Sequence, residues 1–385
     1  MKLLQNNLRR GGVAAIVAAV LGLGIGTAGA GSAQHPMMDD SIVVTTFATG
    51  LSNPRGLKFG PDGDLFVAEG GFPTGEVTAA PTGLGGNCSA GNGGPGEYFG
   101  STTGSRILKI NRHGVVETFV DNLPSSQAGG LASGVADIAF IGDTMYAILA
   151  GAGCSHGVPS IPNGVLRVNR DRSWTVFANL SAFQQAHPVA NPTDPIDGDF
   201  EPDGTWYSMI AVRGELYAVE PNHGELDKIT TRGAITRVID ISASQGHVVP
   251  TVLADHGVFY VSNLGQFDPA QLNTQSVFRI TPSGNIKIVA TGLSKVLGLT
   301  FDGRNRLYVL ETSYSTSNPG PVPGTGRLLR ILPNGKQEVL IDSTSGLLVV
   351  PTGMTFGPDG ALYISNIGYG APLGLGQILK VEFID

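Results

Sequence analysis

A short apolar run with an aromatic residue in its second position recurs six times along this chain. β-Branched and aromatic residues dominate each copy, and Gly, Asp and Asn bound it, which is typical of strands. The six copies are LFVAE (65–69), MYAIL (145–149), LYAVE (216–220), FYVSN (259–263), LYVLE (307–311) and LYISN (362–366). The spacing predicts six similar structural units.

Further strand motifs accompany most copies of this run. A G-L-x-F-like strand precedes it, as in RGLKF (55–59), and an apolar strand with one base follows it, as in LLRI (328–331). A turn then leads to a fourth strand such as NIKIVA (285–290). Because a unit of four strands cannot bury both its faces alone, the units must stack on one another. The pattern predicts an all-β protein, a six-bladed β-propeller with four-stranded antiparallel blades.

The two ends of the chain predict a closed ring rather than an open array. The last repeat stops after its third strand, in ILKVEFID (378–385), and IVVTTFATG (42–50) is an unpaired strand of the fourth type. The N-terminal strand can therefore complete the last blade, which removes exposed strand edges. Connections after strands two and four leave an antiparallel blade on one face, the long-loop face. Recognition is expected there, because binding residues are commonly carried by loops on a rigid scaffold.

The N-terminus reads as an export signal. Basic residues precede the apolar run 11–29, and small-x-small sequences at 28–30 and 31–33 offer cleavage sites. A retained membrane anchor is the other interpretation, but the run is short and rich in glycine. The expected divisions are a signal peptide (1–33), a disordered tail (34–41) and the propeller (42–385). We expect a secreted protein, extracellular or periplasmic, with no stable membrane span after cleavage.

Composition narrows the expected partners. The chain has 385 residues with 56 Gly, 24 Pro and only 14% charged residues, which suits a β protein with many turns. Its net charge is -7, and no cluster of Lys and Arg follows residue 10, which argues against nucleic acid. The expected partner is a small molecule or a protein at the long-loop face, and the protein is expected to be a monomer. Cys88 and Cys154 fit no metal-binding spacing and are expected to form a disulfide in an oxidising compartment.

The last residue of each second strand is the most suggestive position in the repeat. Leu149 is apolar, but the other five carry a side-chain oxygen: Glu69, Glu220, Asn263, Glu311 and Asn366. A closed ring would place them around the mouth of the central channel. Carboxylate and amide oxygens are the ligands that hard cations such as Ca²⁺ prefer. Two interpretations stay open, a divalent cation or polar ligand bound by this ring, or side chains that satisfy loop backbone N–H groups.

Histidine and arginine side chains are also expected near this mouth. His223 in PNHG and His247 in QGHVVP lie in connections of consecutive blades, and His156 falls on the same face. Neutral imidazole can ligate a metal or act as a general base, and ordinary loop hydrogen bonding is the alternative. Arg55, which precedes the first inner strand, could bind an anionic ligand or pair with Glu69.

Two loop segments have unusual compositions. DPIDGDFEPDG (194–204) is acidic, but its spacing misses the EF-hand pattern, so an acidic surface loop is predicted. The Gly-rich segment 83–104 lacks a P-loop lysine and is predicted to be a flexible loop held by Cys88. The sequence has no G-x-S-x-G or H-E-x-x-H motif, so it gives no support for a serine hydrolase or a zincin.

Four motifs together carry a family resemblance: GLSNPRGLKFGPDGDLFVAEGG, DFEPDGTWYSMIAV, EPNHGELDKIT and GHVVPT. From about Val43 to the C-terminus the chain resembles the ScyD/ScyE family of exported bacterial propellers, with NHL and gluconolactonase-type relatives. The resemblance implies a β-propeller and export, and no activity that can be assigned to particular residues. A gluconolactonase-type pattern would imply acidic or amide metal ligands where the first strands begin. Those places here hold Arg55, Ala136, Leu297 and Thr352.

Two classes of function follow from these patterns. The first is an exported binding or scaffold propeller of unknown ligand, favoured by the long Gly-rich loops and the absence of a recognised catalytic set. The alternative is a metal-dependent hydrolase or lyase that acts on a small molecule at the channel mouth. Ca²⁺ is the cofactor that this alternative would use. Fold alone does not decide between them, because propellers host many functions.

Overall fold

The computed structural model describes residues 41–81, 98–192 and 201–384, and its strands group into blades in chain order. Blade one contains β2 (Pro54–Phe59), β3 (Leu65–Glu69), β5 (Phe99–Ile110) and β6 (Val116–Ala128), with the short β4 (Thr78–Ala79) and β7 (Leu131–Ser133) added to its sheet. Blade two contains β8 (Val135–Ile141), β9 (Thr144–Leu149), β10 (Gly164–Val168) and β11 (Trp174–Asn179). Blade three contains β12 (Ser208–Val212), β13 (Glu215–Glu220), β14 (Glu225–Ile229) and β15 (Ile235–Asp240).

The remaining blades follow the same order. Blade four contains β16 (Pro250–Asp255), β17 (Phe259–Asn263), β18 (Gln275–Ile280) and β19 (Ile286–Leu293). Blade five contains β20 (Val296–Phe301), β21 (Leu307–Glu311), β22 (Arg327–Ile331) and β23 (Gln337–Ile341). Blade six contains β24 (Gly353–Phe356), β25 (Leu362–Asn366), β26 (Gly376–Ile384) and β1 (Ser41–Leu51). The helices are η2 (Cys154–His156), α1 (Leu180–Ala186), α2 (Ser242–Gln245) and η3 (Pro269–Gln271).

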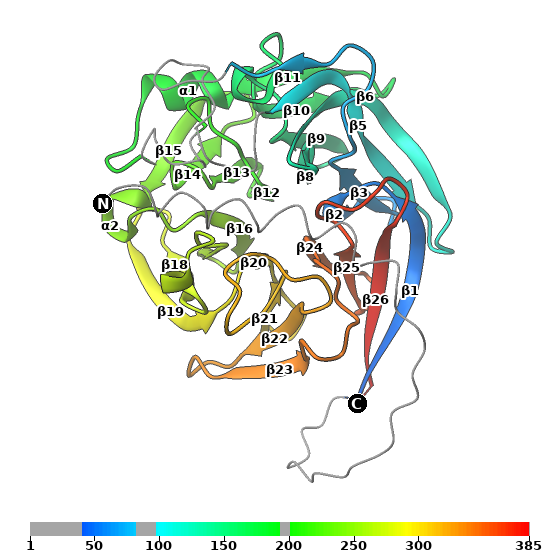
Figure 1. The fold of residues 1–385 in the computed structure, drawn as a ribbon, viewed down its shortest axis with the longest axis vertical. Helices are drawn as coiled ribbons and strands as arrows, with labels where there is room; N and C mark the ends of the chain where they lie inside the picture. Colours follow the sequence, from blue (N-terminus) through cyan, green and yellow to red (C-terminus); the bar gives the residue numbers. More distant parts are fainter. Residues whose placement is uncertain (1–40, 82–97, 193–200, 385) are drawn as a thin grey trace, which may run out of the picture.

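The six sheets surround a central axis (Figure 1). The first strand of each blade is innermost, and these strands contact one another around the axis: β2, β8, β12, β16, β20 and β24. The prediction of a six-bladed β-propeller with four-stranded antiparallel blades is therefore confirmed. Within the described part of the chain, every helix is too short or too polar to cross a bilayer.

The N-terminal strand closes the ring, as the sequence predicts. β1 pairs antiparallel with β26, with Val44 opposite Val381 and Thr45 opposite Lys380. Figure 1 shows the first strand in blue beside the last strand in red. Ala48 at the end of this strand packs with Leu57 of blade one in the same hydrophobic cluster. The joint between the two ends of the chain is therefore both hydrogen-bonded and packed.

Hydrophobic clusters lie between neighbouring blades rather than in one central core. The described residues form six such clusters, each shared by two adjacent blades. The repeated aromatic of strand two is central to them: the Tyr363 ring contacts Phe47 of its own blade at 5.0 Å and Phe59 of blade one at 5.1 Å, edge to face. Phe66 contacts Phe119 and Phe140 in the same way. Such pairs contribute about 0.5–1.5 kcal/mol each beyond their buried area, which explains why the aromatic recurs.

Blade one is longer than the apolar pattern predicts. β5 begins at Phe99, although a flexible loop was expected over residues 83–104, so that prediction is wrong for the end of the segment. Residues 82–97 lie outside the described part. The first residues of β5 are polar and give no apolar strand pattern. Their hydroxyl groups donate to backbone carbonyls instead, as in Ser101 Oγ to Thr74 O (2.5 Å) and Ser105 Oγ to Pro124 O (2.7 Å).

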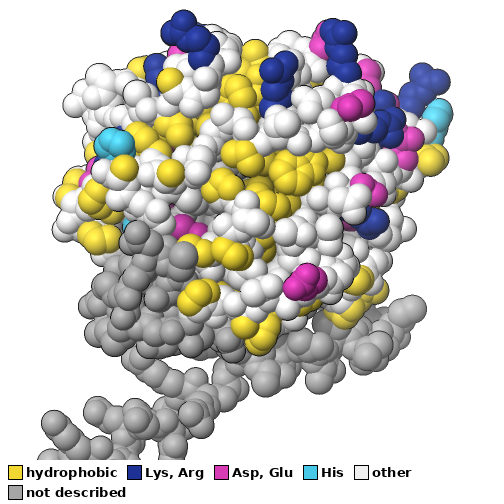
Figure 2. Space-filling model, turned by 90° about the horizontal axis from the view of Figure 1, so that it is seen from above, with side chains coloured by type: hydrophobic (Ala, Val, Ile, Leu, Met, Phe, Trp, Pro, Cys, Tyr) yellow, Lys and Arg dark blue, Asp and Glu magenta, His cyan; other side chains and the backbone are white. Residues whose placement is uncertain are grey.

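The side of the ring carries charges of both signs. Figure 2 shows basic and acidic side chains interspersed along one edge and apolar side chains across the wall. Outer strands contribute single exposed apolar residues, such as Val176 of β11 and Ile288 of β19. Scattered exposed apolar residues are normal on a monomer. This side therefore presents no uniform basic field of the kind that nucleic acid binding needs.

Candidate functional site

The oxygen-bearing residues at the ends of the second strands bind the loop that enters their own blade. The bonds are Glu69 Oε1 to Ser52 N (2.6 Å), Glu220 Oε1 to Thr205 N (2.8 Å), Glu311 Oε1 to Ser294 N (2.8 Å) and Asn366 Oδ1 to Val349 N (2.8 Å). In blade four the direction of the hydrogen bond is reversed, and Asn263 Nδ2 donates to Val248 O at 2.8 Å. In these five blades the end of strand two therefore fixes the incoming connection on the long-loop face.

In two blades the neighbour on strand three explains why this position holds Glu. Glu311 faces Arg327 across β21 and β22, and Arg327 Nε donates to Glu311 Oε2 at 2.6 Å. Blade one repeats this pair at Glu69. In blade six Asn366 faces the neutral Gln377. A buried carboxylate is tolerated only with a paired charge, so these two Glu residues occur where strand three supplies an arginine. In blade three Glu220 faces Glu225 instead, and its cationic neighbour is His223.

These bonds match the second of the two interpretations drawn from the sequence, the satisfaction of loop N–H groups. They also stabilise strained backbone, because the residue after the bonded one is left-handed in four blades: Asn53 (φ 53°), Val249 (φ 56°), Lys295 (φ 45°) and Val350 (φ 39°). Such a conformation costs about 1–3 kcal/mol, most for β-branched valine. Across residues 41–81, 98–192 and 201–384, no three His, Cys, Asp or Glu side chains come together as a metal site. A cation ring stays a prediction that these contacts do not support.

Arg55 lies at the channel mouth, as predicted, near the start of β2. Its side chain is buried, Nη2 donates to Ala132 O and Nη1 donates to the Tyr207 hydroxyl at 3.5 Å. The guanidinium carbon lies 5.8 Å from the centre of the Tyr207 ring and 5.7 Å from that of Tyr369. The alternative pairing with Glu69 is not formed, because Glu69 binds the arginine of β5. Arg55 is thus a buried cation whose hydrogen-bond partners among the described residues are neutral.

A small cavity lies on the axis below this mouth. Its volume is about 30 Å³, and the inner strands of all six blades line it, so it has room for water and not for a substrate. Asp137 and Lys58 line it. Asp137 accepts hydrogen bonds from Ile138 N (2.8 Å), Met209 N (2.9 Å) and Ser208 Oγ (3.1 Å), and burial raises its pKa. A ligand of ordinary size therefore does not fit inside this cavity.

Tyr207 connects the mouth to this cavity. It precedes β12, lines the cavity, donates from its hydroxyl to Thr352 O at 3.2 Å and accepts from Arg55. Its neighbours Trp206 and Ser208 are each fixed by a hydrogen bond to a buried carboxylate. Burial raises the pKa of the Tyr207 phenol above its ordinary value of 10, so the hydroxyl keeps its proton at neutral pH. The structure thereby fixes a proton donor at the head of the channel.

A second polar cluster lies over blades two and three. His156 Nε2 is 3.5 Å from Glu201 Oε1, and the Tyr98 hydroxyl donates to the same oxygen at 2.9 Å. Asp203 Oδ2 accepts from Ser155 N at 3.3 Å. Burial opposes protonation of His156, but the two carboxylates more than offset this effect and raise its pKa.

The predicted acidic surface loop therefore needs correction at its end. Glu201 and Asp203 are only 6% and 2% exposed, because they turn inward against His156. The sequence did not reveal their basic partner, since His156 is distant in the chain and belongs to another blade. The acidic residues Asp194, Asp197 and Asp199 of the same segment lie outside the described residues.

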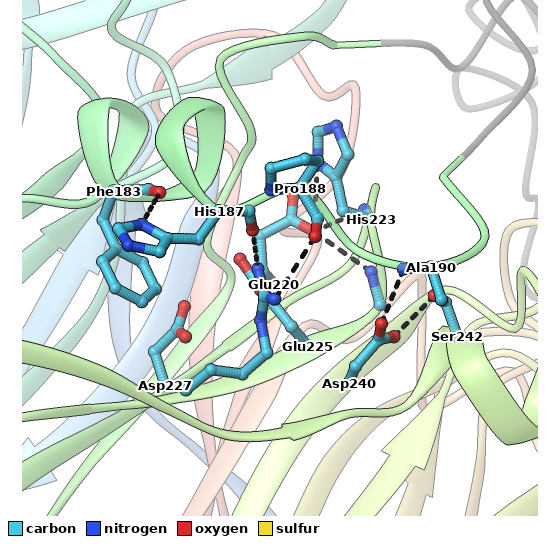
Figure 3. Close-up of polar contacts among 12 residues, drawn as sticks. Phe183, His187, Pro188, Ala190, Glu220, His223, Glu225, Asp227, Asp240 and Ser242 are labelled. Atoms are coloured by element: carbon cyan, nitrogen blue, oxygen red, sulfur yellow. Dashed lines mark hydrogen bonds and ion pairs between the residues drawn. The ribbon is translucent and has the colours of Figure 1, made fainter.

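Blade three holds a further group of buried acids (Figure 3). His223 Nδ1 is 3.5 Å from Glu220 Oε2, and although burial opposes it, this cation lowers the pKa of Glu220. Burial raises the pKa of Glu225 to about 7, against the pull of Arg237, whose Nε donates to Glu225 Oε2. Burial and the nearby Glu225 also raise the pKa of Asp227. His223 thus lies beside Glu220 in this group, and its predicted ligand-binding role stays a prediction.

Arg237 also fixes the segment that follows α1. Its Nη2 donates to His187 O and its Nη1 donates to Pro188 O at 3.4 Å, while Ala190 N donates to Asp240 Oδ2 at 2.7 Å (Figure 3). These bonds attach residues 187–190 to the outer strand of blade three. Arg237 therefore links Glu225 to the backbone of residues 187–188 and holds this side of the cluster in place.

Two other predicted sites are described only in part. His247 is half-buried between α2 and β16, in the connection from blade three to blade four. Cys154 lies in η2 and is not a free thiol. Cys88 lies outside the described residues, so the disulfide between them stays a prediction.

Three residues at the mouth and channel were missed by sequence reasoning. Asp137 carries a carboxylate inside the inner-strand motif VADIAF, where a charged residue in an apolar strand was a usable signal. Tyr207 stands in the inner-strand position of blade three, which the six-repeat pattern could have marked. Tyr369 lies in a connection without a repeat, so nothing in the sequence indicated that it would reach Arg55.

No protein-family model matches the sequence. A gluconolactonase of Zymomonas mobilis subsp. mobilis is 25% identical over 218 residues. This match covers 51% of the chain and only 58% of that enzyme. The similarity therefore spans about half of each protein.

Solved structures give a similarity of fold. The gluconolactonase of Xanthomonas campestris superposes with a TM-score of 0.51 at 10% identity over 89% of each chain. A candidate glucose dehydrogenase of Thermus thermophilus gives 0.53 at 18% identity, over 89% of this chain and all of that one. The narrower resemblance to ScyD/ScyE proteins stays a prediction. The chain is a six-bladed propeller similar to gluconolactonase-type propellers.

Proposed function

We propose that this protein is a hydrolase or lyase that acts on a small molecule at the channel mouth. The observation that carries the proposal is the position of Tyr207, a fixed phenol that keeps its proton and faces a water-sized cavity beside Asp137. The partial sequence similarity to a gluconolactonase supports the same class of reaction. The proposal takes up the hydrolase or lyase part of the alternative drawn from the sequence, without the metal that this alternative included, in place of a purely binding or scaffold role.

The arrangement suits acid–base chemistry. A tyrosine hydroxyl can act as a general acid, and Tyr207 would give its proton to the oxygen or carbon that takes up negative charge. In a hydrolysis, water from the cavity would attack the carbonyl carbon and the bond to the leaving oxygen would break. Asp137 is the carboxylate placed to accept the proton of that water, and its raised pKa makes it a stronger base than an exposed aspartate.

The residues that begin the inner strands do not fit a divalent cation. The inner strands begin at the mouth with Arg55, Ala136, Leu297 and Thr352, together with Tyr207, and none of these supplies a carboxylate or a side-chain amide. A cation such as Ca²⁺ would meet a guanidinium here, so the proposed reaction uses no metal.

A turnover screen tests the proposal. Purified protein is assayed against lactones and lyase substrates with and without EDTA, beside the variants Tyr207→Phe and Tyr260→Phe. We expect EDTA to leave activity unchanged and Tyr207→Phe to lower kcat by about a hundredfold or more. Tyr260 packs against Phe301 in the interface between blades four and five, so Tyr260→Phe is the matched control. Absence of turnover, or full activity in Tyr207→Phe, would count against the proposal.

Export and the monomeric state belong to the same proposal. Residues 1–33 lie outside the described part, and the expectation rests on their sequence pattern. Cell fractionation with N-terminal sequencing of the mature chain tests export, and a full-length chain in the cytoplasm would contradict it. Light scattering tests the oligomeric state.

A further inference from the structure

We propose that Arg55 anchors the carboxylate group of the ligand, so that the molecules bound at the mouth are small carboxylates with an apolar body. The inference rests on the proposed function only in placing the ligand at the mouth. It narrows the anionic ligand that the sequence allowed for Arg55 to a substrate class, small carboxylates with an apolar body.

The charge around Arg55 is the first observation. Of the two arginines buried within the described residues, Arg327 pairs with Glu311. Arg55 donates hydrogen bonds to a backbone carbonyl and a phenol and packs against the Tyr207 and Tyr369 rings, all of them neutral. Asp137, the carboxylate of the axial cavity, is satisfied by backbone and serine donors and does not bind Arg55. A buried charge is costly without a partner, and an anionic ligand would supply that partner.

The geometry of the guanidinium is the second observation. The Tyr207 and Tyr369 rings hold it at 5.8 and 5.7 Å, which restricts its orientation. Ala132 O accepts from one side, and Nε has no acceptor in the part of the chain that the structure describes. Gly70 adjoins this edge, and a side chain there would begin 3.5 Å from Nε. An arginine with a fixed plane and free N–H groups suits the two oxygens of a carboxylate.

The loop that carries Tyr369 supplies the third observation. Gly374 N of this loop donates to Ser52 Oγ at 3.2 Å, which places the loop beside the connection leading to Arg55. Two leucines of the same loop, Leu373 and Leu375, are 59% and 45% exposed. They are an exposed apolar part of the loop that also carries Tyr369, whose ring lies against the Arg55 guanidinium. A ligand that joins a carboxylate to an apolar ring would contact both Arg55 and this apolar part of the loop.

Arg55 lies near the start of an inner strand, β2. The start of β2 therefore carries a buried positive charge whose orientation is restricted by two aromatic rings. An arginine can attract an anion at this position without any bound cation. Binding at the mouth should therefore need no metal and should weaken as salt screens the charge.

The test uses benzoate, acetate and benzamide as probes of the full-length mature protein, with affinity measured by calorimetry or NMR titration. We expect benzoate to bind more tightly than acetate, and benzamide to bind at least about tenfold more weakly than benzoate. Arg55→Gln should weaken benzoate by about ten- to a hundredfold, and Arg55→Lys by less. Arg112→Gln removes an exposed arginine on the opposite face and should change nothing.

Several results would overturn the inference. They are equal affinity for benzoate and benzamide, no benzoate binding at about 10 mM, or an Arg55→Gln variant that melts normally and binds as before. If Arg55→Gln does not fold, the comparison of benzoate with benzamide and the Arg55→Lys affinity decide the question. Carboxylate binding without turnover would leave the inference standing while the proposed reaction fails. Turnover without any preference for carboxylates would support the proposed reaction and overturn the inference about Arg55.

Discussion

Replacing the Glu311–Arg327 pair by two glutamines tests why strand two ends in Glu in one blade and Asn in another. The side chains are 0% and 10% exposed, and Nε lies 2.6 Å from Oε2. Removing one partner of a buried ion pair costs about 3–5 kcal/mol. Glu311→Gln should lower the free energy of unfolding by about 3 kcal/mol, the low end of this range. The reason is that the amide keeps an acceptor for Ser294 N and Arg327 still stacks on Tyr314 at 3.6 Å.

The single variant Arg327→Gln and the double variant complete a double-mutant cycle for this ion pair. Arg327→Gln should cost about 2 kcal/mol, since burial already raises the pKa of Glu311 and the orphaned carboxylate can take up a proton. The double variant should lose only about 1 kcal/mol, because it recreates the neutral pairing of Asn366 with Gln377 in blade six. The coupling energy should then be about 4 kcal/mol.

Urea denaturation followed by circular dichroism gives the four free energies of unfolding. Asp62→Asn with Lys109→Gln provides the control cycle, because that pair is exposed and should couple by less than about 1 kcal/mol. A coupling below about 0.5 kcal/mol at Glu311 and Arg327 would refute the reasoning. It would mean that the charge on strand three does not decide the residue at the end of strand two.

Further predictions concern pH, packing and redox state. The folded pKa of Glu225, about 7, lies above the ordinary 4.5, so the folded state binds this proton more tightly and unfolding free energy should fall by about 3 kcal/mol as pH rises from about 5 to 8. Glu225→Gln should flatten that slope, and a stability that rises over this range would contradict the assignment. Gly56→Ala should destabilise by about 3 kcal/mol or more in the same assay, because its Cβ would lie 2.1 Å from Asp137 Oδ1, and an unchanged midpoint would count against this packing. Thiol titration of unfolded, non-reduced protein should find no free sulfhydryl, and two free groups would exclude a bond between Cys88 and Cys154.

The apolar repeat was enough to predict the blades, their number and the closure of the ring. This is because the pattern reflects packing between adjacent blades, which is the same at every interface. The aromatic of strand two recurs because it fills the same position in each cluster, as Tyr363 does between Phe47 and Phe59. The polar early part of β5 escaped the pattern, since hydroxyl groups bonded to backbone leave no apolar signal.

The candidate site depended on contacts that the repeat does not encode. The sequence by itself placed Arg55 and the residues at the ends of the second strands at one mouth, because sheet geometry fixes which face each strand end reaches. Only the tertiary structure decided that Glu69 pairs across its own sheet, so that Arg55 is left to the rings of Tyr207 and Tyr369. The physical reason is that strand pattern follows from local burial, whereas the partner of a buried charge is set by side chains that meet across blades and loops.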